Sequence, residues 1–160
     1  MSFDAALAGG PYNVTWGGST VGLMDNSLGM EVTPFAELLA NSHTYGRQPL
    51  GGIYLGNEVK VHAVLRLWNS VSKDILWPWN GTLGTPGTVG RDIYDIAKAL
   101  VASAVAGTPA ATAGPATITL TKCIIEPGVP IPITLNSTWR TIPVSFLVML
   151  DSSGNHFSTT

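Results

Sequence analysis

The sequence predicts a mainly β fold, an antiparallel β-sandwich or barrel with one flanking α-helix. Three features favour it: short segments of alternating apolar and polar residues, Gly and Pro between them, and one stretch of helical period. The chain has 160 residues, the size of one ordinary domain. We therefore expect residues 1–160 to form a single domain.

Strands are predicted first in the N-terminal half. Residues 12–16 and 20–23 flank a Gly-Gly-Ser turn. In residues 24–33 the even-numbered positions are mostly apolar, and the odd-numbered positions carry acidic and hydroxyl side chains: Asp25, Ser27, Glu31 and Thr33. Residues 58–68 alternate most clearly, with Val59, Val61, Ala63, Leu65 and Leu67 on one parity. Side chains alternate across a strand, so these segments have one covered face and one wet face.

Further elements are predicted in the C-terminal half. Residues 117–125 and 140–150 have strand character, and Pro143 indicates an edge or a bulge because proline cannot donate a ladder hydrogen bond. Residues 91–105 carry an apolar stripe at helical spacing, with Asp92 and Asp95 in the first turn and Gly107 and Pro109 beyond the end. This segment is the predicted helix.

Three loops separate these elements. The segment 39–52 carries polar residues that are candidates for contact with a neighbour: Asn41, His43, Tyr45, Arg47 and Gln48. The segment 77–90 begins Trp-Pro-Trp and continues with glycine at every third position from Gly81, which predicts a mobile loop. The segment 106–115 is a linker of small residues.

Charged residues make up 11% of the chain, less than half of the ~25% typical of soluble domains. Such a deficit indicates apolar or hydroxyl-rich surface that a partner covers. The net charge of −2 excludes a strongly basic nucleic-acid binder. The charge is uneven, because residues 1–58 hold five acids and one base, for −4, and the remainder five acids and seven bases, for +2.

No catalytic or metal motif is evident. Cys123 lies in a predicted strand and is interpreted as a buried, inert thiol. His43, His62 and His156 lack metal-ligand spacing, and no nucleophile motif accompanies them. We expect no enzymatic activity, no cofactor and no membrane association. Residues 1–4 lack the features of a signal peptide, so assembly in a cytoplasm is expected.

Five tryptophans raise a second possibility, a soluble β-sandwich module that binds a glycan or a peptide. Trp77 and Trp79 flank a proline in a loop. Aromatic residues are enriched at protein interfaces, so both are candidates for an interface or a loop anchor, with core packing as the alternative.

Three blocks of sequence resemble bacteriophage tail tube proteins. They are residues 10–18 (GPYNVTWGG), residues 45–56 (YGRQPLGGIYLG), and residues 139–146 (WRTIPVSF) with 151–157 (DSSGNHF). The blocks follow one another in the family's order, from near one end of the chain to the other.

The resemblance implies a structural subunit that forms stacked hexameric rings around a channel for DNA, within a virion tail assembled in the host cytoplasm. Its partners would be further copies of itself and other tail proteins at the tube ends. The loop 39–52 would reach the neighbouring ring. A secretion-system tube subunit is a related alternative.

Acidic side chains on a channel wall repel phosphate, so DNA passes without binding. The candidates for the channel wall are Asp25, Glu31, Glu37 and Glu58. Ordinary solvated carboxylates are the alternative interpretation of these residues.

Overall fold

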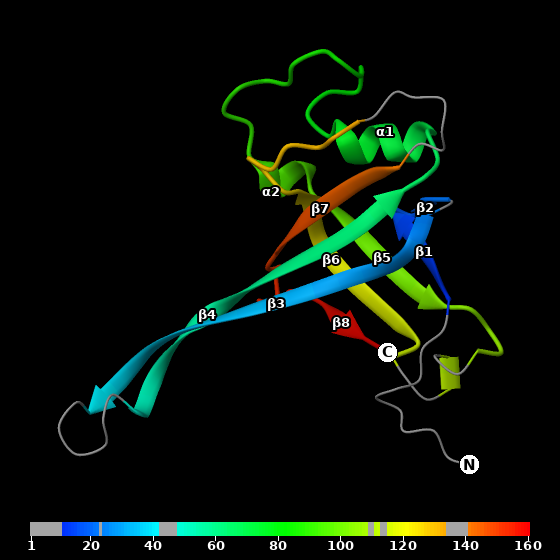
Figure 1. Cartoon of the computed structure of the whole chain (residues 1–160). Helices are drawn as coiled ribbons and strands as arrows, with labels where there is room; N and C mark the ends of the chain where they lie inside the picture. The colour runs from blue at the N-terminus through cyan, green and yellow to red at the C-terminus, as the bar shows by residue number, and fades with distance from the viewer. Residues whose placement is uncertain (1–10, 23, 42–47, 109–110, 113–114, 134–140) are drawn as a thin grey trace.

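The computed structural model describes residues 11–22, 24–41, 48–108, 111–112, 115–133 and 141–160. In these residues the chain forms eight strands and two helices (Figure 1). The strands form one antiparallel sheet in the order β2-β1-β5-β6-β7-β4-β3, with β8 beside β6. The predicted mainly β, antiparallel fold with flanking helical structure is confirmed.

The elements of the first half are β1 (Tyr12–Trp16), β2 (Ser19–Thr20), β3 (Met24–Asn41), β4 (Gln48–Leu65) and α1 (Ser70–Leu76). Those of the second half are α2 (Ile93–Ile96), β5 (Lys98–Ala104), β6 (Thr117–Ile125), β7 (Ile142–Met149) and β8 (Ser158–Thr159). The strands predicted at 12–16 and 117–125 are confirmed at both ends as β1 and β6, and β7 begins and ends within two residues of the strand predicted at 140–150.

The core face of β4 is the predicted one. Val59, Val61, Ala63 and Leu65 are all buried. They lie opposite β7 in register, Val61 against Phe146 and Ala63 against Val144. Alternating apolar side chains from two adjacent strands thus form one continuous apolar face.

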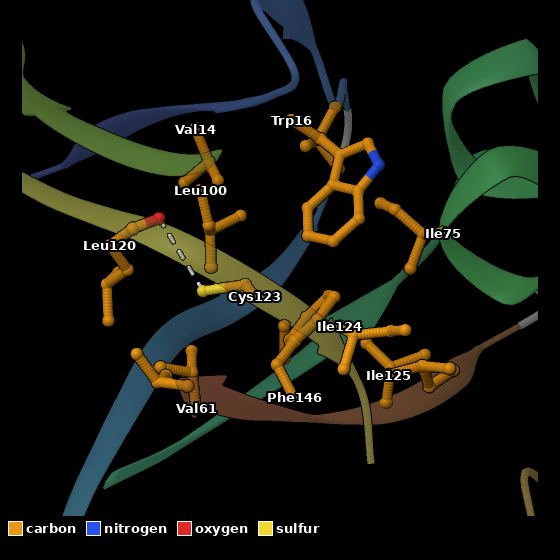
Figure 2. Packing of buried hydrophobic residues seen from close by; sticks show 14 of the residues in the cluster. Val14, Trp16, Val61, Ile75, Leu100, Leu120, Cys123, Ile124, Ile125 and Phe146 are labelled. Carbon is orange, nitrogen blue, oxygen red and sulfur yellow. Dashed lines mark hydrogen bonds between the residues drawn. The ribbon is translucent and has the colours of Figure 1, made fainter. Parts of the chain in front are cut away.

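The sheet curls over this core. The Trp16 ring on β1 lies 5.3 Å from the Phe146 ring on β7, although β5 and β6 separate these strands in the sheet (Figure 2). Helix α1 adds the buried Ile75 and Leu76 to the same cluster. The curvature therefore lets a single sheet enclose a core as the two layers of a sandwich do.

Cys123 lies inside this core, as predicted. A register shift between β5 and β6 lets Leu120 and Cys123 both face inward, although they are three residues apart. The Cys123 thiol donates to the Leu120 carbonyl oxygen at 3.6 Å (Figure 2). Burial raises the pKa of this thiol to about 12, so it stays protonated.

The helix predicted over residues 91–105 is wrong for most of its length. Only Ile93–Ile96 is helical, and Lys98–Ala104 is β5, a strand paired with β1 and β6. The apolar residues of this segment fit the period of a strand as well as that of a helix: Leu100 and Ala102, two positions apart, both face the core. The segment is a strand because it hydrogen-bonds to two neighbouring strands, and this pairing outweighs its helical periodicity.

Helix α1 was not predicted. Its N-terminus is a capping box in which the Asn69 side chain accepts from the Ser72 backbone N–H and Ser72 Oγ accepts from the Asn69 N–H. Asn at the N-cap is a recognisable start signal. The helix has seven residues, too few for its periodicity to stand out.

Candidate assembly surfaces

The β3–β4 hairpin forms the first surface. β4 residues 59–65 pair with both β3 and β7, whereas residues 48–57, in the described part of the chain, pair with β3 alone. Residues 34–41 and 48–57 therefore leave the body as a two-stranded ribbon, called here the arm (Figure 1).

The loop predicted over residues 39–52 is accordingly corrected: both of its ends are strand. Asn41 and Gln48 are register partners at the far end of the arm. His43, Tyr45 and Arg47 lie outside the described residues. Gly52, predicted to lie in this loop, is a strand residue of β4, and an added Cβ there would lie 2.8 Å from the Glu37 carbonyl oxygen. Glycine here permits close approach of the two strands.

The arm exposes apolar side chains. Leu38, Leu39 and Ile53 are 64%, 61% and 60% exposed, and Tyr54 and Leu55 are exposed as well. An isolated two-stranded ribbon is marginally stable in water. Apolar surface of this kind is typical of a protein that is covered by a partner.

The second surface is the face of β3, β4 and β7 turned away from the core, called here the acidic face. It brings together two of the four predicted channel acids: Glu31 lies opposite Lys60, and Thr33 lies opposite Glu58. Glu37 lies on the arm opposite Ile53, apart from this group. Asp25 is in register with Val64, and its side chain lies outside the described part of the structure.

A chain of polar contacts joins the acidic face. His62 Nε2 lies 3.1 Å from Glu31 Oε2, and His62 Nδ1 lies 3.1 Å from Ser145 Oγ. Ser145 Oγ donates to Glu126 Oε2 at 2.8 Å, and Lys60 Nζ lies 2.6 Å from Glu126 Oε1. Strands β3, β4 and β7 and the end of β6 are thereby linked through side chains.

Ser145, His62 and Glu31 have the order of residues in a nucleophilic triad, but the hydrogen bonds differ. A triad histidine accepts the serine proton. Here that proton is donated to Glu126, so the serine oxygen faces His62 as an acceptor. Ser145 also lies in the middle of β7, on a regular ladder. This arrangement fixes side chains on a sheet and does not activate the Ser145 hydroxyl.

Sequence reasoning missed Ser145 and Glu126. The β4–β7 pairing places Ser145 on the acidic face, and Glu126 joins it at the end of β6, where its backbone N–H donates to the Ser145 carbonyl oxygen at 2.8 Å. The strand signal at 140–150 gave the alternation of β7. It did not give the register that places Ser145 opposite His62.

Trp77 and Trp79 hold the glycine-rich loop. Trp77 Nε1 donates to the Thr85 carbonyl oxygen at 2.8 Å, and Trp79 packs against the core cluster. A Cβ at Gly87 would lie 2.6 Å from the Trp79 carbonyl oxygen, so loop and tryptophan are in close contact. At the loop's outer end Val89 is 98% exposed. Loop anchoring is thus observed, and a role for these tryptophans in an interface stays a prediction.

Of the two remaining histidines, the structure describes only His156. His156 Nδ1 is 3.3 Å from the Val148 carbonyl oxygen, and His43 is outside the described residues. Within the described ranges, no three His, Cys, Asp or Glu side chains are grouped so that they could hold a metal ion. In the same ranges, no helix has the length and hydropathy needed to cross a membrane. Scans of known family models and of curated proteins found no match to this chain.

Proposed function

We propose that this chain is the repeating structural subunit of a phage tail tube, which assembles into stacked hexameric rings around a channel for DNA. The observation that carries the proposal is the arm. Its exposed Leu38, Leu39 and Ile53 need a partner surface, and a neighbouring copy of the chain supplies one. The proposal rests also on the resemblance of the three sequence blocks to tail tube proteins.

The outer edge of β3 supports assembly through strand pairing. β3 has 18 residues and ends the strand order of the sheet. Long exposed edges pair with other chains unless something protects them. Pairing β3 with the neighbouring subunit around a ring would close a shared barrel and remove this edge.

The acidic face suits a channel wall. Glu31 and Glu58 lie on it, and the only lysine in its described polar chain of contacts is paired with carboxylates. A wall of this charge repels phosphate at short range, so DNA passes without specific binding. The subunit's partners are then other copies of itself and the tail proteins at the tube ends. No reaction is part of this function.

The alternative of a glycan- or peptide-binding module depends on free tryptophan faces. Trp16 is buried in the core and bonded to Asp74, Trp77 is bonded to Thr85, and Trp79 packs on the core. These contacts favour a structural use of the three rings. Trp68, by contrast, is 41% exposed, so the tube function is preferred because of the exposed arm and not because of the tryptophans.

Sedimentation velocity tests the proposal. We expect the wild-type chain to form large assemblies as its concentration rises. The double variant Leu38→Ser, Leu39→Ser should stay monomeric and folded, because neither side chain belongs to the core. The control is Val89→Ser, which removes an even more exposed apolar side chain from the glycine-rich loop and should assemble normally. Assembly of the arm variant at wild-type concentrations would contradict the role of the arm.

A further inference from the structure

The positive charge of Lys60 is unexpected on a face along which DNA is proposed to pass. This lysine lies on β4 between Glu31 of β3 and Leu147 of β7 in the register of the sheet. A lysine ammonium on such a wall would neutralise a phosphate and hold it. Two carboxylates lie near its Nζ atom, Glu126 Oε1 at 2.6 Å and Glu58 Oε1 at 3.7 Å.

Glu126 is the better placed of the two. Its second oxygen accepts from Ser145 Oγ at 2.8 Å, and its backbone N–H is bonded to Ser145 as well. Its side chain is 16% exposed, against 38% for Glu58. A carboxylate that is already oriented gives up little side-chain entropy to form an ion pair.

The protonation states agree with this geometry. Hydrogen bonds from Lys60 first and from Ser145 second lower the pKa of Glu126. The hydrogen bond to Glu126 is in turn the main cause that raises the pKa of Lys60. The pair is therefore fully charged at neutral pH, and its charges cancel.

We propose that Glu126 is a charge-masking residue, which occupies the Lys60 ammonium so that the acidic face presents Glu31 and Glu58 to DNA without the free positive charge of Lys60. The inference rests on the proposed function, because it requires DNA to pass this face. It assigns opposite roles to the acids of one surface. Glu31 and Glu58 repel phosphate, whereas Glu126 prevents the lysine from binding it.

The test uses a short fluorescent DNA duplex and the purified chain at low salt, with binding followed by anisotropy. Glu126→Gln should bind more tightly than wild type. A plot of the logarithm of its binding constant against the logarithm of the salt concentration should have a steeper negative slope than that of wild type. The slopes should differ by about 0.9, the value for one additional phosphate contact. Adding Lys60→Gln to this variant should restore wild-type binding.

The matched control is Asp95→Asn, an exposed acid at α2 outside the acidic face. It changes the net charge by the same amount as Glu126→Gln. Equal binding and equal salt slopes for the two variants would overturn the proposal, because net charge alone would then explain the gain.

A second variant tests the masking with Glu126 in place. Lys60→Gln alone should lower DNA binding no more than Lys73→Gln, since the wild-type Lys60 amine does not contact phosphate. Lys73→Gln removes an exposed lysine of α1 and changes the net charge equally. A clearly larger loss for Lys60→Gln would overturn the proposal. Electron microscopy of the wild-type chain separates the two claims. If no tubes form, the proposed function fails, and a Lys60-dependent gain in Glu126→Gln would still show masking.

Discussion

Trp16 Nε1 donates a hydrogen bond to Asp74 Oδ2 at 2.8 Å, which joins β1 to helix α1. The same carboxylate oxygen lies 2.6 Å from Lys98 Nζ at the start of β5. The indole ring meanwhile packs on Phe146 of β7. Trp16 thus connects β1 with β7, which are not neighbours in the sheet, and joins both to helix α1.

Replacing Trp16 by Phe should destabilise the chain. The variant keeps an aromatic ring in the core, but it loses the hydrogen bond to Asp74 and part of the buried area. We expect a loss of about 1 to 3 kcal/mol in the free energy of unfolding, measured by urea denaturation. Trp68→Phe is the control, because Trp68 is an exposed ring, and it should change stability by less than about 0.5 kcal/mol.

Gly87→Ala should loosen the loop that follows Trp79. The new methyl group would lie 2.6 Å from the Trp79 carbonyl oxygen and 2.7 Å from its Cβ. The backbone must move, at a cost of about 1 to 3 kcal/mol, and the melting temperature should fall. Gly81→Ala is the matched control in the same loop, since nothing lies within 4 Å of its added Cβ. Equal melting temperatures for the two variants would contradict the described contact.

Cys123 should resist thiol reagents in the folded chain. Its pKa is raised to about 12 from an ordinary 9.0, so at pH 8 the thiolate fraction is on the order of one in ten thousand. Reaction with a disulfide reagent should be complete in denaturant and should require unfolding in its absence. Rapid native labelling would show that the β5–β6 register shift does not bury this residue.

Acid should weaken the link between the end of β6 and strands β4 and β7. Because the folded-state pKa of Glu126 is lowered from its ordinary 4.5, its contribution to stability is present above pH 4.5 and is lost as the pH falls through the folded-state value. Denaturation midpoints measured between pH 6 and pH 3 should fall further for wild type than for Glu126→Gln. Parallel profiles would contradict the ion pair with Lys60.

The sequence allowed the prediction of elements whose signal is local. The alternation of residues 58–65 identified the buried side of β4 correctly, because buried apolar residues at every second position, 59, 61, 63 and 65, do not fit a helical period. Residues 98–104 satisfied both periods, and their strand pairing with β1 and β6 arises only in the folded sheet. The segment 39–52 was predicted as a loop, whereas Gly52 lies on β4 and allows β4 to approach β3 closely.

The candidate surfaces were predicted only in part, because only the local alternation of side chains can be seen in the sequence. The alternation placed Glu31 and Glu58 each on the polar side of its own predicted strand, and the register of β3 and β4 brings the two sides together on one face. Glu37 shares the parity of Glu31 but lies beyond the body of the sheet, on an arm whose length no local pattern indicated. Ser145 and Glu126 joined the acidic face through contacts between distant segments, and no spacing in the sequence indicates such contacts.

Negative-stain electron microscopy of the purified chain over a range of concentrations is the most direct test of whether the chain assembles into tubes. We expect hollow rings of sixfold symmetry that stack into striated tubes. We also expect that the Leu38→Ser, Leu39→Ser variant forms no tubes. Single particles of monomer size at every concentration, with sedimentation in agreement, would contradict assembly as the function of this fold.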